Sequence, residues 1–171
     1  MALELCLAVR LIPKNQAQVE DLGKGERIYY RYAGYFGKDS YLPVRFEQPL
    51  EKGVYLVEGF MSKLMNAPVF VGENFFRLKE YSPVNSFALE GRIVNLESWK
   101  DKQIARVYDS YGHGWSVHFY SPVVLETGDF IKVKGNVRKK DRMLWFVATH
   151  TERLSAVYFR EPLYPTGVFK E

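Results

Sequence analysis

Short segments in which apolar and polar residues alternate recur along this sequence, separated by turns rich in Gly, Pro and Asn. A period of two residues is typical of β-strands that bury one face, and no long segment has the 3.6-residue period of an amphipathic helix. Residues 15–22 alone are compatible with a short helix. The sequence therefore predicts an all-β fold.

The strand-like segments occur twice in the same order. They span residues 3–13, 26–35, 41–46, 54–61 and 74–81 in the first copy, and 87–96, 102–108, 115–120, 130–139 and 143–151 in the second. Short motifs align between the copies, among them Val57-Glu58-Gly59 with Val133-Lys134-Gly135. We infer an internal duplication, with a linker at 83–86 in which Pro83 stops strand continuation.

A glycine lies in the fourth strand of each copy, at Gly59 and at Gly135. A strand that coils round a small barrel bends sharply where side-chain bulk is absent. Each copy spans roughly 70 to 80 residues, a size at which five strands still enclose a core. We expect two tandem five-stranded Greek-key barrels, at residues 1–82 and 87–154, followed by an extended C-terminal tail at 155–171.

The charge balance is mildly basic, with 24 Lys and Arg against 20 Asp and Glu and a pI of about 9.0. This balance suits a polyanionic partner. No apolar run approaches the roughly 20 residues of a membrane span, and the first residues do not read as a signal peptide. The single cysteine, Cys6, cannot form an internal disulfide. We expect a cytoplasmic protein with no membrane partner.

The sequence lacks the motifs of common enzyme classes: it has no nucleophile elbow, no phosphate-binding loop and no dinucleotide-binding glycine pattern. Its histidines and its cysteine do not have the spacing of a zinc site. Asp109 and His113 could form a dyad, but a hairpin turn explains this segment better, and no nucleophile is evident beside them. We expect no catalytic residue, no metal and no cofactor.

The second copy carries a Gly-acidic pair at Gly128-Asp129, then an apolar strand that reaches Gly135, a basic loop and a last strand containing Trp145. In this order the features resemble the later half of the OB-fold single-stranded DNA-binding proteins. The resemblance covers residues 87–154 clearly, and the first copy through the internal match. It implies OB-type barrels that bind single-stranded nucleic acid, DNA rather than RNA, in replication, recombination or repair. Bacterial members of that family typically end in an acidic tail, which this sequence does not have.

OB folds present the outer faces of their second and third strands to nucleic acid, edged by the loops after the first and fourth strands. Side-chain alternation turns an Arg on the second strand, and an Arg or His on the third, outward in both copies. Rings stack on bases and cations contact phosphates, so this pairing suits binding without sequence preference. A register shift of one residue would exchange the inward and outward sets. The candidates on these strands are Tyr29, Arg31, Arg45, Arg106, Tyr108, His118 and Tyr120.

Further candidates lie on the fourth and fifth strands and in the loops. Six cations fall within positions 132–142, with Asp141 as the only acid, a run that suits phosphate contact but also a solubilising edge. Trp145, and Phe75 at the matching place in the first copy, have outward parity if Phe146 and Phe76 face the core. Trp99 lies in the loop after the first strand of the second copy. These candidates are Phe75, Trp99, Lys132, Lys134, Arg138, Lys139, Lys140, Arg142 and Trp145.

Two other functions fit the same pattern. An OB-type barrel can bind RNA, and the 2′-hydroxyl contacts that would decide this are not visible in a sequence. The barrels could also dock a protein within a larger nucleic-acid assembly. In that case the aromatic tail would serve as a plug on a partner or on a second copy, although it could equally wrap the second barrel.

Overall fold

The computed structural model describes residues 2–14, 16–37, 40–120, 123–140 and 143–154, with the backbone alone for residue 140. These residues form β-strands joined by turns, as the sequence predicts. No helix in this part of the chain is long and apolar enough to cross a membrane. The strands are β1 Glu4–Pro13, β2 Gln18–Asp21, β3 Glu26–Phe36, β4 Ser40–Phe46, β5 Gly53–Leu64, β6 Ala67–Leu78, β7 Asn85–Ser98, β8 Gln103–Tyr108, β9 Gly114–Phe119, β10 Phe130–Lys140 and β11 Met143–Arg153.

The strand pairings form the same closed circuit twice. In the first ring, β1 pairs with β3, β3 with β4, β4 with β6, β6 with β5, and β5 with β1. In the second ring, β7, β8, β9, β11 and β10 pair in the same order, and β10 returns to β7. The third and fifth strands pair in parallel in both rings, and the other pairs are antiparallel. This repeated pairing order agrees with the internal duplication.

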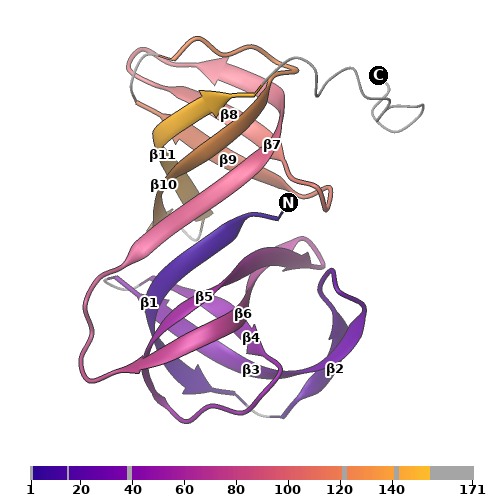
Figure 1. The fold of residues 1–171 in the computed structure, drawn as a ribbon, viewed down its shortest axis with the longest axis vertical. Coiled ribbons are helices and arrows are strands. Elements are labelled where there is room, and N and C mark those ends of the chain that lie inside the picture. Colours follow the sequence, from indigo (N-terminus) through magenta and orange to yellow (C-terminus); the bar gives the residue numbers. More distant parts are fainter. Residues whose placement is uncertain (1, 15, 38–39, 121–122, 141–142, 155–171) are drawn as a thin grey trace.

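The two rings lie one above the other along the long axis of the molecule (Figure 1). They are joined through β1 and β7, because Glu4–Leu7 pairs antiparallel with Asn85–Ala88. The strand β7 begins at Asn85, so the last residues of the predicted linker already belong to it. The junction is therefore a hydrogen-bonded ladder along β7 rather than an open connection.

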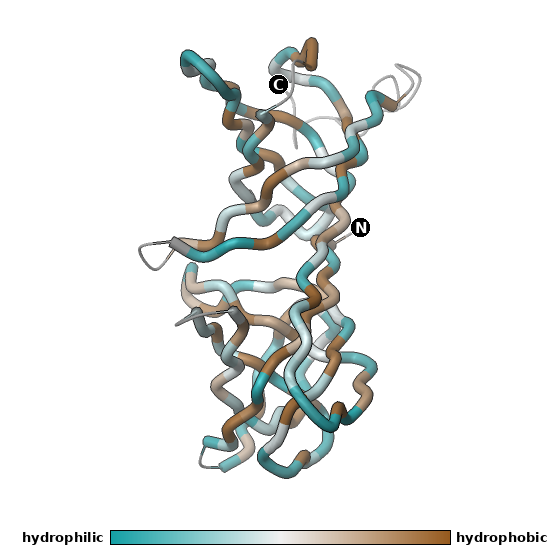
Figure 2. Tube along the Cα trace, turned by 90° about the vertical axis from the view of Figure 1, so that its left-hand side faces the viewer, coloured by the Kyte–Doolittle hydropathy of each residue, from teal (hydrophilic) through white to brown (hydrophobic). Residues whose placement is uncertain are grey.

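The core follows the alternation seen in the sequence. Hydrophobic and hydrophilic residues follow one another along the strands (Figure 2), and one cluster of buried apolar side chains fills both rings. A second and smaller cluster lies on the outside of the first ring; we call it the outer cluster, and it consists of Leu22, Tyr29, Phe60, Val69 and Val71. Burying a side chain of this size contributes about 1.5–3 kcal/mol.

The segment predicted as a possible helix holds the strand β2 instead. Its residues Gln18–Asp21 pair antiparallel with Glu26–Tyr29 of β3. The helix prediction is wrong because a weak local propensity yields to pairing with a neighbouring strand.

The last strand of the first ring begins at Ala67, not at the predicted Asn74. A two-residue turn at Met65 and Asn66, with φ of 53° and 68°, joins β5 directly to β6. Val44 pairs with Phe70 as Val117 pairs with Phe146, so Phe70 is the equivalent of Phe146. The residue that matches Trp145 is therefore Val69, and the predicted match with Phe75 is wrong.

Candidate nucleic-acid interface

The outer surface of β8 and β9, here called the β8–β9 face, is the most open strand surface among the sequence candidates. Arg106 and Tyr108 of β8 point outward and are exposed, while the alternate residues Ala105 and Val107, and Val117 opposite Ala105 on β9, are fully buried. Arg106 lies opposite Ser116, and its Nη1 donates a hydrogen bond to Ser116 Oγ at 3.4 Å. The outward orientation expected for Arg106 and Tyr108 is confirmed.

One end of the β8–β9 face carries three aromatic rings around one ammonium group. Lys102 Nζ lies 5.8 Å from the ring centroid of Trp99, 5.6 Å from that of Tyr120 and 5.0 Å from that of Trp145. We call these four residues the aromatic cluster. Trp99 is 58% exposed and Tyr120 48%. The short loop before β8 is closed by a backbone hydrogen bond from Trp99 N to Lys102 O at 2.7 Å, which holds two members of the cluster together.

His118 supports the aromatic cluster from below. Its ring stacks on Trp145, with centroids 4.4 Å apart and planes 12° apart, and only 4% of the residue is exposed. Burial, and then the nearby Lys102, lower the pKa of His118. His118 was expected to face solvent; it is covered because Trp145, on the parallel neighbour β11, lies across it. It therefore packs beneath the aromatic cluster and is not an exposed phosphate ligand.

A cavity of about 410 Å³ opens beside the aromatic cluster. Its size falls within the range of small-ligand sites in proteins. Trp99, Tyr120, Lys102 and Gln103 supply rings, a cation and an amide to its wall. These groups can stack on a base, contact a phosphate and hydrogen-bond to a base edge.

The first ring closes the opposite end of the β8–β9 face. Lys63, near the tip of the β5–β6 hairpin, donates a hydrogen bond from Nζ to Gly114 O at 3.0 Å and lies 4.7 Å from the ring centroid of Trp115. Burial, followed by repulsion from Arg106, lowers the pKa of Lys63. This contact fixes the position of the face relative to the first ring.

The basic run on β10 divides into separate groups. Arg138 is exposed and is the pairing partner of Trp145, so it extends the β8–β9 face beyond the aromatic cluster. Lys139 turns toward the first ring, where Nζ donates to Tyr41 O and lies 4.5 Å from the ring centroid of Tyr41. Lys132 and Lys134 lie near the start of β10, away from Arg138 and Lys139. The side chain of Lys140, Arg142, and the tail at 155–171 lie outside what the structure describes.

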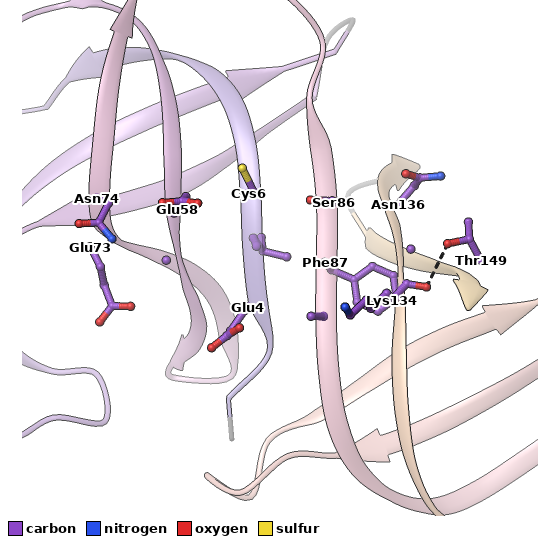
Figure 3. A pocket seen from close by; sticks show the side chains of 14 residues that line it. Glu4, Cys6, Glu58, Glu73, Asn74, Ser86, Phe87, Lys134, Asn136 and Thr149 are labelled. Carbon is purple, nitrogen blue, oxygen red and sulfur yellow. Dashed lines mark hydrogen bonds between the residues drawn. The ribbon is translucent and has the colours of Figure 1, made fainter. Parts of the chain in front are cut away.

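The cavity shown in Figure 3, of about 590 Å³, lies at the junction of the two rings. The carboxylates of Glu4, Glu58 and Glu73 come from β1, β5 and β6 on one side, and Lys134 comes from β10 on the other. Burial, and then Glu58, raise the pKa of the Cys6 thiol at its wall. Three carboxylates repel a phosphate backbone, so this cavity does not suit nucleic acid.

The equivalent face of the first ring, formed by β3 and β4, is covered. Tyr29 is 1% exposed because it packs in the outer cluster, and Arg45 is 5% exposed because its Nε donates to Glu20 Oε1 at 2.8 Å. The solvent exposure expected for Tyr29 and Arg45 is wrong, since the segment that contains β2 lies across them. Arg31 has the expected orientation but is only partly exposed.

Phe75 faces the core instead of solvent. Its ring meets those of Phe46 and Tyr55 edge-on, each at a centroid distance of 5.9 Å. The neighbouring Phe76 is 60% exposed. The predicted orientation is wrong because Glu73 is an extra residue at a β-bulge, which reverses the alternation beyond it.

Asp109 organises a turn. Its Oδ1 accepts hydrogen bonds from the backbone N–H groups of Tyr111 and His113, and its Oδ2 accepts one from Trp115 Nε1 at 3.0 Å. These bonds account for the burial of Asp109 and form the predicted hairpin turn. Among the residues that the structure describes, no group of three or more His, Cys, Asp or Glu side chains is placed to hold a metal ion.

No family model matches the sequence, and no curated protein matches it. Among solved structures, the single-stranded DNA binding protein from Thermus aquaticus aligns over 91% of this chain and 93% of that chain, at 16% identity and a TM-score of 0.57. A deletion mutant of that protein aligns over 90% and 94%, at 17% identity and a TM-score of 0.60. The protein has an OB-type fold. The S. pombe Stn1-Ten1 complex covers only 46% of this chain and 64% of its own, at 17% identity and a TM-score of 0.40, and supports no further comparison.

Proposed function

We propose that this protein binds single-stranded DNA, with little sequence preference, through the β8–β9 face of its second ring. The observation that carries the proposal is the aromatic cluster, in which the exposed rings of Trp99 and Tyr120 flank the ammonium group of Lys102. Base stacking on such rings contributes about 1–3 kcal/mol per base and accepts any base.

Lys102 has a specific part in this proposal. Without DNA its ammonium group lies over three ring faces, an arrangement worth about 0.5–1 kcal/mol for each exposed contact. A base that stacks on Trp99 or Tyr120 takes one of these ring faces, and the flexible Lys side chain then reaches the phosphate of the same nucleotide. The exposed Arg106 of β8 and Arg138 of β10 add positive charge to the same ring of strands.

Single strands are preferred in this account because the rings need free base faces, which a duplex hides in its stack. The fold shared with a protein named as a single-stranded DNA binding protein supports the same choice, and DNA over RNA rests on that likeness. We further propose that each closed circuit of strands is a five-stranded OB-type barrel, and that the protein is a binding module without catalytic activity.

Tryptophan fluorescence tests the proposal, because Trp99 and Trp145 lie in the cluster whereas Trp115 is buried. Oligo-dT is expected to quench the wild-type protein at low salt. Trp99→Phe keeps a stacking ring, so affinity is expected to stay close to wild type while the quenching amplitude falls. Trp99→Ala is expected to reduce both the affinity and the quenching amplitude. Full quenching in Trp99→Phe, with wild-type affinity in Trp99→Ala, would place the DNA elsewhere.

A further inference from the structure

The loops that follow the first strand of each ring differ in length. Residues 99–102 suffice between β7 and β8, whereas residues 14–25 separate β1 from β3 and include the strand β2. We call residues 16–25 the β2 segment. It lies across the outer surface of β3 and β4, which is the equivalent of the β8–β9 face.

Under the β2 segment, two arginines stand opposite each other. Arg31 of β3 and Arg45 of β4 are direct pairing partners. Like charges directly opposite on two strands repel each other. One carboxylate, that of Glu20, serves this pair, and it bonds to Arg45 with both side chains less than a tenth exposed. Arg31 Nε is buried without a hydrogen-bond partner. Among the residues that the structure describes, the two facing arginines therefore have one ion pair between them, that of Arg45 with Glu20.

In the part of the chain that the structure describes, the β2 segment pairs with β3 over four residues and takes no part in the closed circuit of the first ring. Besides the Glu20–Arg45 bond, Lys24 Nζ bonds to Glu73 Oε2 of β6 and lies 4.9 Å from the ring centroid of Phe60.

Leu22 anchors the β2 segment in the outer cluster, while Val19 and Ile28, a pair across β2 and β3, are 61% and 59% exposed. Release of the segment would break the ion pairs of Glu20 and Lys24 and uncover Leu22, but the pairings among the five strands of the ring do not involve β2.

We propose that the first ring holds a second phosphate-binding site, formed by Arg31 and Arg45, in which the carboxylate of Glu20 occupies the place of a phosphate until a DNA strand displaces it. This inference rests on the proposed function. A strand held at the β8–β9 face raises the local concentration of phosphates near the first ring. A long strand then displaces Glu20 and occupies both rings, whereas a short one occupies the second ring alone.

Replacing Glu20 tests the proposal directly. Glu20→Gln keeps the shape of the side chain but removes the charge that competes with phosphate. It is expected to enlarge the number of nucleotides covered per protein and to raise affinity for long oligo-dT by about tenfold, with little effect on short oligo-dT. Glu26→Gln is the matched control, because it removes an exposed acid of β3 beside the same hairpin. Equal site size and affinity in Glu20→Gln and wild type would overturn the proposal.

A cross-link provides a second test that leaves Glu20 in place. In Val19→Cys/Ile28→Cys, oxidation is expected to tie β2 to β3 and to keep long oligo-dT off the first ring. Reduction is expected to restore the wild-type site size. Oxidised wild-type protein, which carries Cys6 alone, is the control. The same site size in oxidised and reduced double variant would overturn the proposal even where Glu20→Gln fails to fold.

The two proposals fail in different ways. A wild-type protein that does not bind short oligo-dT at low salt contradicts the proposed function. Wild-type binding that neither Glu20→Gln nor the cross-link changes contradicts the second site alone.

Discussion

Gly59 and Gly135 occupy the same position in the two rings, each in the fourth strand opposite a β-bulge of the fifth strand. A β-carbon on Gly59 would lie 1.9 Å from Val71 O, and one on Gly135 would lie 1.9 Å from Val147 O. Both glycines are therefore required by close approach of the facing backbone. The same steric constraint therefore occurs at Gly59 and again at Gly135. This repetition supports the duplication.

We expect Gly59→Ala and Gly135→Ala each to destabilise the fold by about 3 kcal/mol or more, because a carbonyl of the facing strand must move. Urea unfolding followed by circular dichroism measures the change. Gly37→Asn is the control, since Gly37 has a φ of 62° in open space, a conformation that Asn tolerates. A loss of less than about 1 kcal/mol in both alanine variants would contradict this packing.

Trp99 and Trp145 are expected to separate binding from stability. Trp99→Ala removes an exposed ring, so oligo-dT affinity is expected to fall about tenfold or more while stability changes by less than about 0.5 kcal/mol. Trp145→Ala also uncovers His118, and we expect it to destabilise the fold by about 2 kcal/mol.

Phe76→Ala is the matched control for these two variants, because Phe76 is an exposed aromatic side chain on β6 of the first ring and not on the β8–β9 face. Equal binding defects in Phe76→Ala and Trp99→Ala would mean that loss of affinity reports a general surface effect. Fluorescence anisotropy of labelled oligo-dT measures all three.

Lys102→Gln is expected to reduce the dependence of affinity on salt. If Lys102 contacts one phosphate, the slope of log K against log [salt] falls by about 0.7, the value for a single strand. Lys79→Gln removes an exposed cation outside the face and serves as the control. Titrations at four salt concentrations give the slope for each protein. The same slope in Lys102→Gln and wild type would mean that Lys102 contacts no phosphate and only packs on the aromatic rings.

His118 is expected to make stability depend on pH. Its pKa is lowered in the folded state, so the unfolded chain binds a proton more readily, and stability falls as the pH drops through the ordinary value near 6.5. His118→Phe keeps a ring against Trp145 and removes the buried, unpartnered Nδ1. We expect the variant to lose less stability than wild type between pH 7.5 and pH 5. Thermal melts of both proteins at the two pH values measure this. Equal losses of stability in wild type and His118→Phe would mean that His118 is not the source of the pH dependence.

Much of the second ring could be predicted from its sequence because its loops are short and its alternation is regular. Arg106 and Tyr108 face outward as expected, and the turn at residues 109–114 forms where Asp and Gly indicated one. The aromatic cluster could be predicted only in part. Trp99, Tyr120 and Trp145 were candidates, but Lys102 was not, since the convergence of three rings on its ammonium group depends on how three strands meet.

The first ring was harder to predict because two of its features are not visible in alternation. The β2 segment has few apolar residues, so nothing in its pattern indicated that Glu20 would cover Arg45. The bulge at Glu73 shifts the register by one residue, and the two-residue turn at Met65 and Asn66 lengthens the strand before it. The side chains therefore exchange their expected orientations: Phe75 faces the core and Phe76 faces solvent.

The most direct test of the central claim is a titration of the wild-type protein with oligo-dT and with a duplex of equal length, at low and at moderate salt, followed by tryptophan fluorescence. Stacking on Trp99 and Tyr120 is expected to give strong quenching by oligo-dT, weaker binding of the duplex, and affinity that falls as salt rises. Quenching by the duplex equal to that by oligo-dT, or no quenching by either at low salt, would contradict the account.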